Sequence, residues 1–278
     1  MIRKVVAISF AAILLGSTAY VLLDTFVLEQ RYDSSVAIST ANAAGTASIT
    51  VKTYTADNTT IHVADIYLDD GQTIQSTLAD NTYGKNVTDT TSNMAESVGA
   101  TIAINGDYYG ARSSGYVIRN SELLRSEKAS DSQEDMVLWS DGTMSIISEG
   151  DYTAEQLLEK DAVQVLSFGP GLIINGEISV DTNDEVGKAM ASNPRTAVGY
   201  LGYNHYVLVV ADGRTNESEG LSLLQLAEFM QTLGVEQAYN LDGGGSSTMY
   251  YDSNVINNPT TNGSRIAERK VSDILYVK

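Results

Sequence analysis

Residues 222–248 read SLLQLAEFMQTLGVEQAYNLDGGGSST, and this stretch carries the strongest fold signal in the chain. Ser222 and Gln225 form a capping-box pattern, apolar side chains then recur at helical spacing, and Gly234 supplies a helix stop. An apolar strand follows and ends at Asp242, just before three glycines and three hydroxyl residues. The stretch therefore predicts a helix that is followed by a strand and a glycine loop, in a domain that combines helices with sheet.

Outward from this stretch, most patterns have the two-residue period of strands. Two pairs of such runs are joined by hairpin turns, one at 56–58 and one at Asp141-Gly142. We find no internal repeat and no glycine- or proline-rich linker after Gly45. The expected fold is therefore one α+β domain over 46–278, with a mixed, largely antiparallel sheet and a few helices. The expected strands are 48–54, 60–68, 101–105, 116–119, 135–140, 143–148, 163–168, 196–201, 206–211 and 271–277, and the expected helices are 92–98, 154–160 and 223–233.

Composition limits the classes of function. The 278 residues are 43% hydrophobic and 19% charged, which is typical of a globular protein and excludes a disordered, collagen-like or coiled-coil chain. Cysteine is absent, which excludes disulfides, cysteine-ligated zinc, iron–sulfur clusters and a thiol nucleophile. The net charge of −18 argues against a nucleic-acid partner. An anionic substrate would need a local cationic pocket.

The N-terminal residues predict a membrane anchor. Two basic residues precede 19 uncharged residues, 5–23, which is about the length that a helix needs to cross a bilayer. We expect a transmembrane signal-anchor over 1–28 and a polar spacer over 29–45, with the following domain outside the cell because the basic pair favours a cytoplasmic N-terminus. The alternative is a signal peptide that is cleaved near Ala19.

The loop after Leu241 is the first candidate site. Consecutive glycines let backbone N–H groups converge on an anion, and the preceding carboxylate would be a catalytic acid. It is not a Walker loop, because no lysine follows the glycines. The structural alternative is a tight turn between two strands. The candidate residues are Asp242, Gly243, Gly244, Gly245, Ser246, Ser247 and Thr248.

Three further groups stand where loops meet strands. Asn105 and Asp107 lie in an Asn-Gly-Asp-Tyr-Tyr run, whose polar groups suit sugar hydroxyls and whose rings suit the apolar face of a sugar. Arg195 and Arg214 each stand at a strand end, where a guanidinium would clamp a phosphate, and Asp212 precedes Arg214 by two residues. The alternatives are plain turns, and surface arginines paired with carboxylates.

The sequence has few of the residues that other catalytic mechanisms need. Serine-triad hydrolysis needs a base, and the two histidines, His62 and His205, lie in strand-like runs. Zinc held by histidines would need more of them. The sequence requires no cofactor. A divalent cation held by Asp107, Asp212 or Asp242 stays open, although no EF-hand spacing is present.

Taken together and in order, six segments resemble the phosphodiester glycosidase family, which comprises enzymes of the N-acetylglucosamine-1-phosphodiester α-N-acetylglucosaminidase type. The resemblance is specific because the LDGGGSST block and the two arginine motifs, NPRTAVGY and VVADGR, occur together at the family's spacing. Two departures are the turn at 120–122 and Ser272-Asp273, where Ser-Asn is more usual. The segments are 105–126, 167–178, 193–200, 209–214, 220–249 and 268–277.

The resemblance implies hydrolysis of a sugar-1-phosphodiester, at the bond between the anomeric carbon and phosphate, in cell-envelope glycans or related phosphoglycans. We hypothesise that Arg195, Arg214 and the N–H groups of 243–246 hold the phosphodiester, while Asn105 fixes a sugar hydroxyl. Asp242 or Asp107 would act as nucleophile or as base for water, and Asp212 is the third candidate catalytic carboxylate. The alternatives are a membrane-tethered module that binds anionic glycans without turnover and a metal-dependent phosphodiesterase that cuts the P–O bond.

Overall fold

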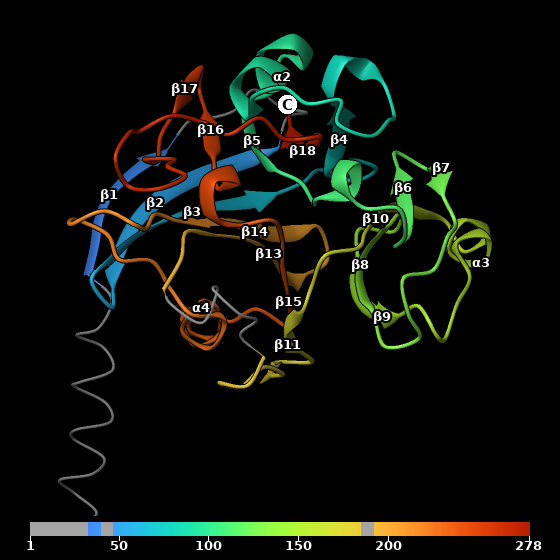
Figure 1. The fold of residues 1–278 in the computed structure, drawn as a ribbon. Coiled ribbons are helices and arrows are strands. Elements are labelled where there is room, and N and C mark those ends of the chain that lie inside the picture. The colour runs from blue at the N-terminus through green and yellow to red at the C-terminus, as the bar shows by residue number, and fades with distance from the viewer. Residues whose placement is uncertain (1–32, 40–46, 185–191) are drawn as a thin grey trace, which may run out of the picture.

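The computed structural model describes residues 33–39, 47–184 and 192–278, which form one α+β domain (Figure 1). The described residues contain three sheets and three α-helices. Every strand pair among them is antiparallel, which confirms the α+β class and the largely antiparallel character, whereas the expected mixed sheet has no parallel pair in the described residues.

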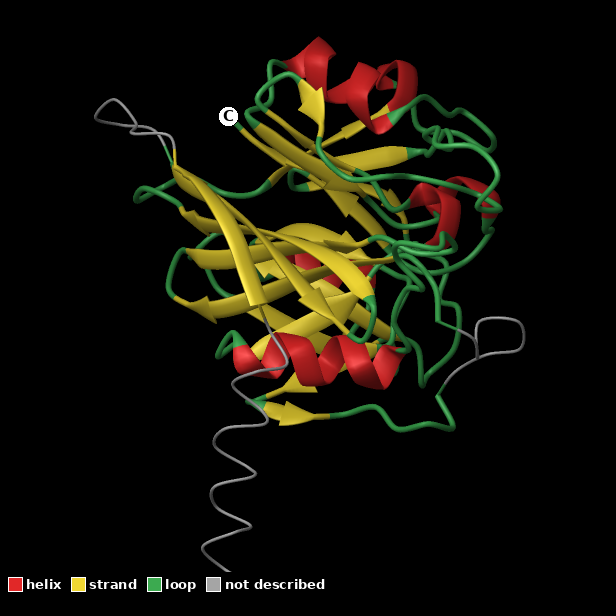
Figure 2. Cartoon of the chain, turned by 90° about the vertical axis from the view of Figure 1, so that its left-hand side faces the viewer, coloured by secondary structure: helices red, strands yellow, loops and turns green. Residues whose placement is uncertain are grey.

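The largest sheet has eight strands, in the order β1-β2-β3-β14-β13-β15-β11-β12. Helix α4 (Leu223–Thr232) packs on one face of it, where Leu226, Phe229 and Met230 are buried (Figure 2). The strands are β1 (Asp33–Ser39), β2 (Ser48–Ala56), β3 (Thr59–Tyr67), β11 (Gly171–Ile174), β12 (Glu177–Ile178), β13 (Arg195–Gly202), β14 (His205–Ala211) and β15 (Gln237–Asn240).

Two five-stranded sheets complete the domain, in the orders β17-β16-β5-β18-β4 and β7-β6-β10-β8-β9. Helix α2 (Thr91–Val98) covers the first, and α3 (Ala154–Glu159) covers the second. The strands are β4 (Gln75–Leu78), β5 (Ile102–Asn105), β6 (Val117–Arg119), β7 (Glu122–Arg125), β8 (Glu134–Trp139), β9 (Met144–Ser148), β10 (Ala162–Leu166), β16 (Met249–Tyr251), β17 (Asn254–Val255) and β18 (Asp273–Val277).

The central hydrophobic core lies where the three sheets meet. Leu208 of β14 and Ile104 of β5 belong to one buried cluster with Met136 of β8, and each is fully buried. Burying a side chain of this size stabilises a fold by about 1.5–3 kcal/mol. Neighbouring residues of the same strands point the other way, so that Val209 packs toward α4 and Ala103 toward α2. The core therefore fixes all three sheets relative to one another.

Local sequence signals account for several elements. The β2–β3 hairpin turns at Asp57 and Asn58, whose φ angles of 47° and 54° lie in the left-handed region that these residue types tolerate. Ser222 and Gln225 form the capping box of α4, as the sequence predicts.

Strand β1 lies where the sequence predicts a polar spacer. It lies within 29–45, a segment without strand periodicity, and pairs antiparallel with β2. Its backbone groups extend the edge of the large sheet, so pairing decides its conformation where local propensity does not. The predicted anchor over 5–23 lies outside the described residues. Within the described ranges, none of the helices has the length and apolar character needed to cross a bilayer.

Strand pairing brings the candidate loops together. β15 ends at Asn240 and pairs with β13, so the loop that contains Asp242 lies beside Arg195 at the start of β13. β5 ends at Asn105 and pairs with β18, where Asn105 is opposite Ile274. The loops that follow β15 and β5 and the loop that precedes β18 therefore meet at one edge of the domain.

Candidate active site

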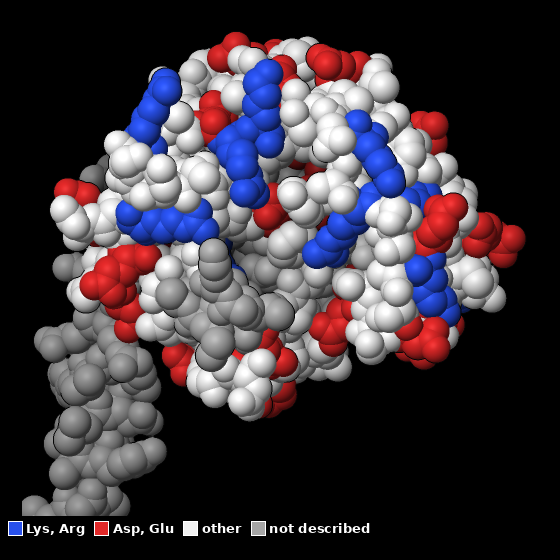
Figure 3. Space-filling view, viewed as in Figure 1, with Lys and Arg blue, Asp and Glu red and all other residues white. Residues whose placement is uncertain are grey.

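Two adjoining cavities lie at this edge, and they share Asp242 and Arg269. Their volumes are about 210 and 370 Å³. On the face of the molecule that is drawn in Figure 3, basic side chains lie around a hollow. The smaller cavity is lined by Asp107, Tyr108, Asp242, Ser246, Arg269 and Ser272 among others, and the larger by Phe168, Arg195, Arg214, Asp242, Gly243 and Gly244 among others.

Asp242 lies at the junction of the two cavities. Its Oδ2 accepts hydrogen bonds from the Ser246 hydroxyl at 2.6 Å and from Arg269 Nη2 at 2.7 Å. The residue is only 9% exposed. Burial raises the pKa of this carboxyl above its ordinary value, and the Arg269 charge and the Ser246 hydrogen bond offset part of that rise. Asp242 is therefore a buried carboxyl beside a cation, with a shifted pKa of the kind that marks a candidate catalytic group.

Arg269 is a site residue that the motif reasoning did not select. It comes from the loop before β18, and its Nε donates to the Ser246 hydroxyl at 2.8 Å. The guanidinium thus holds both Ser246 and Asp242, and it lines both cavities. The sequence signal was the basic pair Arg269-Lys270 just before the last strand.

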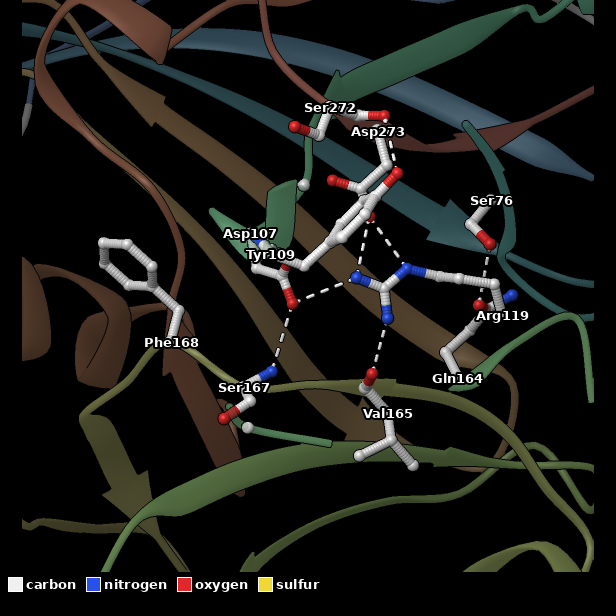
Figure 4. Close-up of polar contacts among 12 residues, drawn as sticks. Ser76, Asp107, Tyr109, Arg119, Gln164, Val165, Ser167, Phe168, Ser272 and Asp273 are labelled. Atoms are coloured by element: carbon white, nitrogen blue, oxygen red, sulfur yellow. Dashed lines mark hydrogen bonds and ion pairs between the residues drawn. The ribbon is translucent and has the colours of Figure 1, made fainter. Parts of the chain in front are cut away.

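Asp107 lies in the wall of the smaller cavity. Its Oδ1 accepts the Tyr109 backbone N–H at 2.9 Å and its Oδ2 accepts the Ser167 backbone N–H at 3.1 Å. Arg119 Nη2 lies 3.0 Å from Oδ2 (Figure 4). These donors fix the carboxylate of Asp107, which is 2% exposed.

Asp273 shares Arg119 with Asp107 and was also missed. Its Oδ2 accepts from Arg119 Nε at 2.8 Å, and it is fully buried (Figure 4). Burial raises the pKa of Asp273 to about 7, while the Arg119 charge acts in the opposite direction. A Cβ at Gly106 would lie 2.3 Å from Asp273 Oδ1, so this approach requires glycine. The signal was Asp273 itself, where the resemblance expects asparagine.

Arg195 and Arg214 line the larger cavity together with Gly243 and Gly244. Arg195 Nε donates to the Leu221 carbonyl at 2.8 Å, and Arg214 Nη2 donates to Asn193 Oδ1 at 3.0 Å. Burial and the positive charge of Arg269 both lower the pKa of Arg214. The structure thus brings both predicted arginines to the glycine turn and adds a third, so that cations surround one side of Asp242.

The predicted backbone nest needs correction. The N–H of Gly244 donates to the Pro194 carbonyl at 2.8 Å, and the N–H of Ser246 donates to the Gly243 carbonyl at 3.3 Å. Two of the four N–H groups of 243–246 are therefore already satisfied by the protein. The 3-10 turn Gly244–Ser246 accounts for the Ser246 bond, and the neighbouring Pro194 segment accounts for the Gly244 bond. Positive charge for an anion comes mainly from the arginines.

Asn105 lines neither cavity. It is fully buried, its Nδ2 donates to the Asp242 carbonyl at 2.7 Å, and its Oδ1 accepts from Thr196 at 2.9 Å. Its amide groups are occupied within the protein, so the predicted contact with a sugar hydroxyl is corrected to a positioning role for the Asp242 loop. Gly245, Ser247 and Thr248 are likewise buried behind the turn and line neither cavity.

Asp212 also lies away from the cleft. Its Oδ1 accepts from Asn257 Nδ2 at 3.0 Å and from the Asn258 N–H at 2.8 Å. Burial alone would raise its pKa, but His62 and the Asn258 N–H lower it overall. Asn257 in turn donates to the Ser247 carbonyl at 3.0 Å. Asp212 therefore supports the glycine turn from behind, and the prediction that it is a catalytic carboxylate is corrected.

The three candidate carboxylates do not form a common cluster. Asp107 and Asp242 face the smaller cavity and Asp212 does not. In the described part of the chain, no group of three or more acidic or histidine side chains could hold a metal ion. The described residues therefore provide no ligand set for the divalent cation that the sequence leaves open.

Comparison with known proteins places the chain in a family. A model of the phosphodiester glycosidase family matches residues 98–278. The chain belongs to the phosphodiester glycosidase family, and this match includes the Asp107, Asp242 and Arg269 segments.

Two relatives match part of the chain. The chain is 31% identical over 188 residues to mouse N-acetylglucosamine-1-phosphodiester α-N-acetylglucosaminidase, covering 62% of this chain and 35% of the mouse protein. It is 27% identical over 201 residues to the SPbeta prophage-derived uncharacterized protein YomE of Bacillus subtilis (strain 168), covering 70% and 30%. The chain thus spans about a third of these relatives.

Two solved structures are similar to this chain in fold. The catalytic domain of the zebrafish N-acetylglucosamine-1-phosphodiester α-N-acetylglucosaminidase, auto-inhibited by its pro-peptide, superposes with a TM-score of 0.66 at 20% identity, covering 89% of this chain and 88% of that one. A hypothetical protein from Synechocystis gives a TM-score of 0.63 at 14% identity, covering 88% and 64%. At these identities the likeness concerns the fold alone.

Proposed function

We propose that this protein hydrolyses sugar-1-phosphodiesters by cleaving the bond between the anomeric carbon and the phosphate oxygen. The observation that carries the proposal is the Asp242–Arg269 pair at the junction of two cavities. A phosphodiester held at that junction has its sugar on one side and its second alcohol on the other. Two cavities that share a carboxyl and a guanidinium match this shape.

The smaller cavity suits the sugar. Tyr108 lines it and is 45% exposed, so its ring is available for stacking on the apolar face of a pyranose. Asn86, Thr88 and Ser272 line the same cavity with polar groups for hydroxyls. The cavity therefore combines one aromatic face with several hydrogen-bonding groups, which is the chemistry of a carbohydrate site.

The larger cavity suits the phosphate and the second alcohol. Arg214 and Arg269 lie close enough for the charge of one to lower the pKa of the other, which a bound anion would relieve. Arg195 lines the same cavity. Phe168 and Leu223 add apolar wall for the carbon skeleton of the alcohol. Guanidinium groups hold the phosphate as negative charge gathers on it in the transition state.

Asp242 acts at the anomeric carbon. Its Oδ2 is engaged by Ser246 and Arg269, whereas its Oδ1 accepts no hydrogen bond from the described residues. By one route the Asp242 carboxylate bonds to the anomeric carbon as the bond to the phosphate oxygen breaks, the electron pair leaves with the phosphate monoester, and water then hydrolyses the glycosyl ester and releases the sugar. By the other route Asp242 takes a proton from water, and the water oxygen bonds to the anomeric carbon as the phosphate monoester leaves with the electron pair. The released anomer separates the two routes: retention indicates Asp242 as nucleophile, and inversion indicates Asp242 as base.

The test is sugar release by the full-length chain from a methyl diester of a sugar 1-phosphate. Asp242→Asn removes the charge and keeps the shape, so we expect kcat to fall by about a thousandfold or more. Asp151→Asn, at an exposed aspartate that lines neither cavity, is the matched control and should keep full activity. Equal turnover by folded Asp242→Asn and wild type would contradict the assignment. Binding without sugar release would favour a glycan-binding module.

We place the natural substrate among phosphoglycans of the cell envelope. This part of the proposal rests on the uncharged run at 5–23, which predicts a single-pass membrane protein with an extracellular domain. The check is fractionation of cells that express the full chain. Recovery in the membrane pellet after a high-salt wash is expected, and recovery in the soluble fraction would contradict it.

A further inference from the structure

A third cavity of about 270 Å³ lies beside the candidate active site. The turn over 108–112 separates the two: Tyr108 and Ala111 line the smaller active-site cavity, while Tyr109 and Arg112 line the third. We call the third cavity the accessory cavity. Its lining includes Tyr83, Lys85, Tyr109, Arg112, Arg125 and Glu127.

The accessory cavity collects positive charge that the protein does not neutralise. Lys85, Arg112 and Arg125 line it, against one acidic lining residue among the described ones, Glu127. Within the described ranges, none of these three cations forms an ion pair with a carboxylate. In a chain of net charge −18, cations left without carboxylates form a local attraction for anions.

Two of these cations are held in place by neutral groups. Arg125 is 7% exposed, and its guanidinium donates to the carbonyls of Gly115 at 2.6 Å and Tyr109 at 3.0 Å. Arg112 donates to the Ser167 carbonyl at 3.2 Å. Carbonyl partners fix a guanidinium without removing its charge, so an anion binds with little further loss of side-chain freedom.

An aromatic wall stands beside the cations. The rings of Tyr83 and Tyr109 are stacked, with centroids 5.4 Å apart and planes 16° from parallel. Tyr83 is 38% exposed. A cationic cavity with a tyrosine face suits a phosphate group that is attached to a carbohydrate.

We propose that the accessory cavity binds a second phosphate of the substrate, carried by the same sugar whose anomeric bond is cut. The inference rests on the proposed function, which places that sugar in the neighbouring cavity. The preferred substrate is then a sugar that is phosphorylated both at its anomeric carbon and at another hydroxyl, as in a phosphoglycan chain linked through phosphodiesters.

The test compares two compounds on the full-length chain. One is a sugar 1-(methyl phosphate), and the other carries an additional methyl phosphodiester on its primary hydroxyl. We expect KM for the second compound to be about tenfold lower at low salt, as one charge-assisted contact gives, and this advantage to shrink as salt rises. Equal KM values for the two compounds would overturn the proposal.

Charge reversal at a lining residue tests whether the KM advantage of the two-phosphate compound arises in the accessory cavity. Lys85→Glu should abolish the KM advantage of the two-phosphate compound and leave kcat and KM for the one-phosphate compound unchanged. Arg112→Gln is a second variant with the same expectation, and Lys160→Glu, an exposed lysine elsewhere, is the matched control. An advantage that survives in Lys85→Glu and Arg112→Gln would refute the accessory site.

Direct binding separates the two proposals. If neither compound releases sugar, the proposed function fails, and calorimetric titration of both compounds into the wild-type chain still reports on the accessory cavity. Tighter binding of the two-phosphate compound, lost in Lys85→Glu, supports the site. Equal affinity of the two compounds refutes it. Inorganic phosphate serves as the third titrant: if it binds as tightly as the two-phosphate compound, the cavity is a site for free phosphate and the substrate assignment is wrong.

Discussion

Burial and a guanidinium act on the Asp242 carboxyl in opposite directions. Burial raises its pKa, and the Arg269 charge and the Ser246 hydrogen bond lower it. Because the nucleophile or base must be a carboxylate, activity is present above this pKa and is lost as the pH falls through it. The loss should therefore begin at a higher pH than for an exposed aspartate.

Arg269→Gln tests this balance. Removing the guanidinium leaves burial less opposed, so the pKa of Asp242 should rise and the acid limb of kcat/KM should move to higher pH. The measurement is the pH profile of kcat/KM on a sugar-1-phosphodiester, with Lys160→Gln as a control that leaves the profile in place. An acid limb that stays where it is, or moves to lower pH, would argue against Arg269 as the partner that tunes Asp242.

Asp135 is a buried carboxyl outside the cleft. It is fully buried, and neither of its oxygens has a hydrogen-bond partner in the described residues. Burial, with the negative charge of Glu149 beside it, raises its pKa to about 9. The folded state therefore binds a proton that the unfolded state releases above about pH 4, so stability is lost as the pH rises toward 9.

Asp135→Asn should relieve this cost. Asparagine keeps the shape and does not ionise, so we expect a gain of roughly 2 kcal/mol in the free energy of unfolding at pH 8 and little change at pH 4. Urea unfolding at the two pH values measures it. A variant that is less stable than wild type at pH 8 would show that the charged form is accommodated.

Site residues were predictable where one segment carries its own signal. The sequence indicates the Asp242 loop and both arginines, which line one cavity in the structure, because glycine runs and loop–strand arginines are visible locally. Arg269 and Asp273 are not indicated, because their partners are set by the fold: Arg269 reaches Asp242 across 27 residues and Asp273 reaches Arg119 across 154. Asn105 and Asp212 show the converse. Their residue types suit a site, but both are buried, and their hydrogen bonds hold the Asp242 loop from behind.

At the level of elements, capping and turn chemistry gave the most reliable expectations. Helix α4 begins at Leu223 with the expected cap, and the β2–β3 and β8–β9 hairpins form at the expected turns. The short strands β1, β4 and β11 were not expected, because each forms through pairing with strands distant in the chain or through an existing sheet edge.

The cap of α4 gives a stability prediction. Ser222 accepts the Gln225 backbone N–H at 3.0 Å, and Ser222→Ala leaves that donor without its partner. We expect a loss of about 1 kcal/mol, measured as a lower urea midpoint at unchanged m-value. Ser222→Asp keeps a capping oxygen and should retain most of the stability. An unchanged midpoint in Ser222→Ala would mean that water replaces the cap without cost.

Across the whole molecule, three sheets converge so that their loops share one edge. The sequence predicts a mixed, largely antiparallel sheet, whereas the described strands are divided among three sheets. That division depends on which faces pack together around Leu208, Ile104 and Met136, and no local pattern encodes it. The same packing gathers arginines at the cleft of a strongly acidic chain, which gives an anionic substrate an electrostatically favourable approach.

Hydrolysis in ¹⁸O-labelled water tests the central claim most directly, because it reports which bond is cut. The full-length chain is incubated with a methyl diester of a sugar 1-phosphate, and mass spectrometry locates the label in the products. Attack at the anomeric carbon predicts ¹⁸O in the released sugar and none in methyl phosphate. Label in a phosphate product would mean that the P–O bond is cleaved, and would contradict a glycosidase that acts through Asp242 and Arg269.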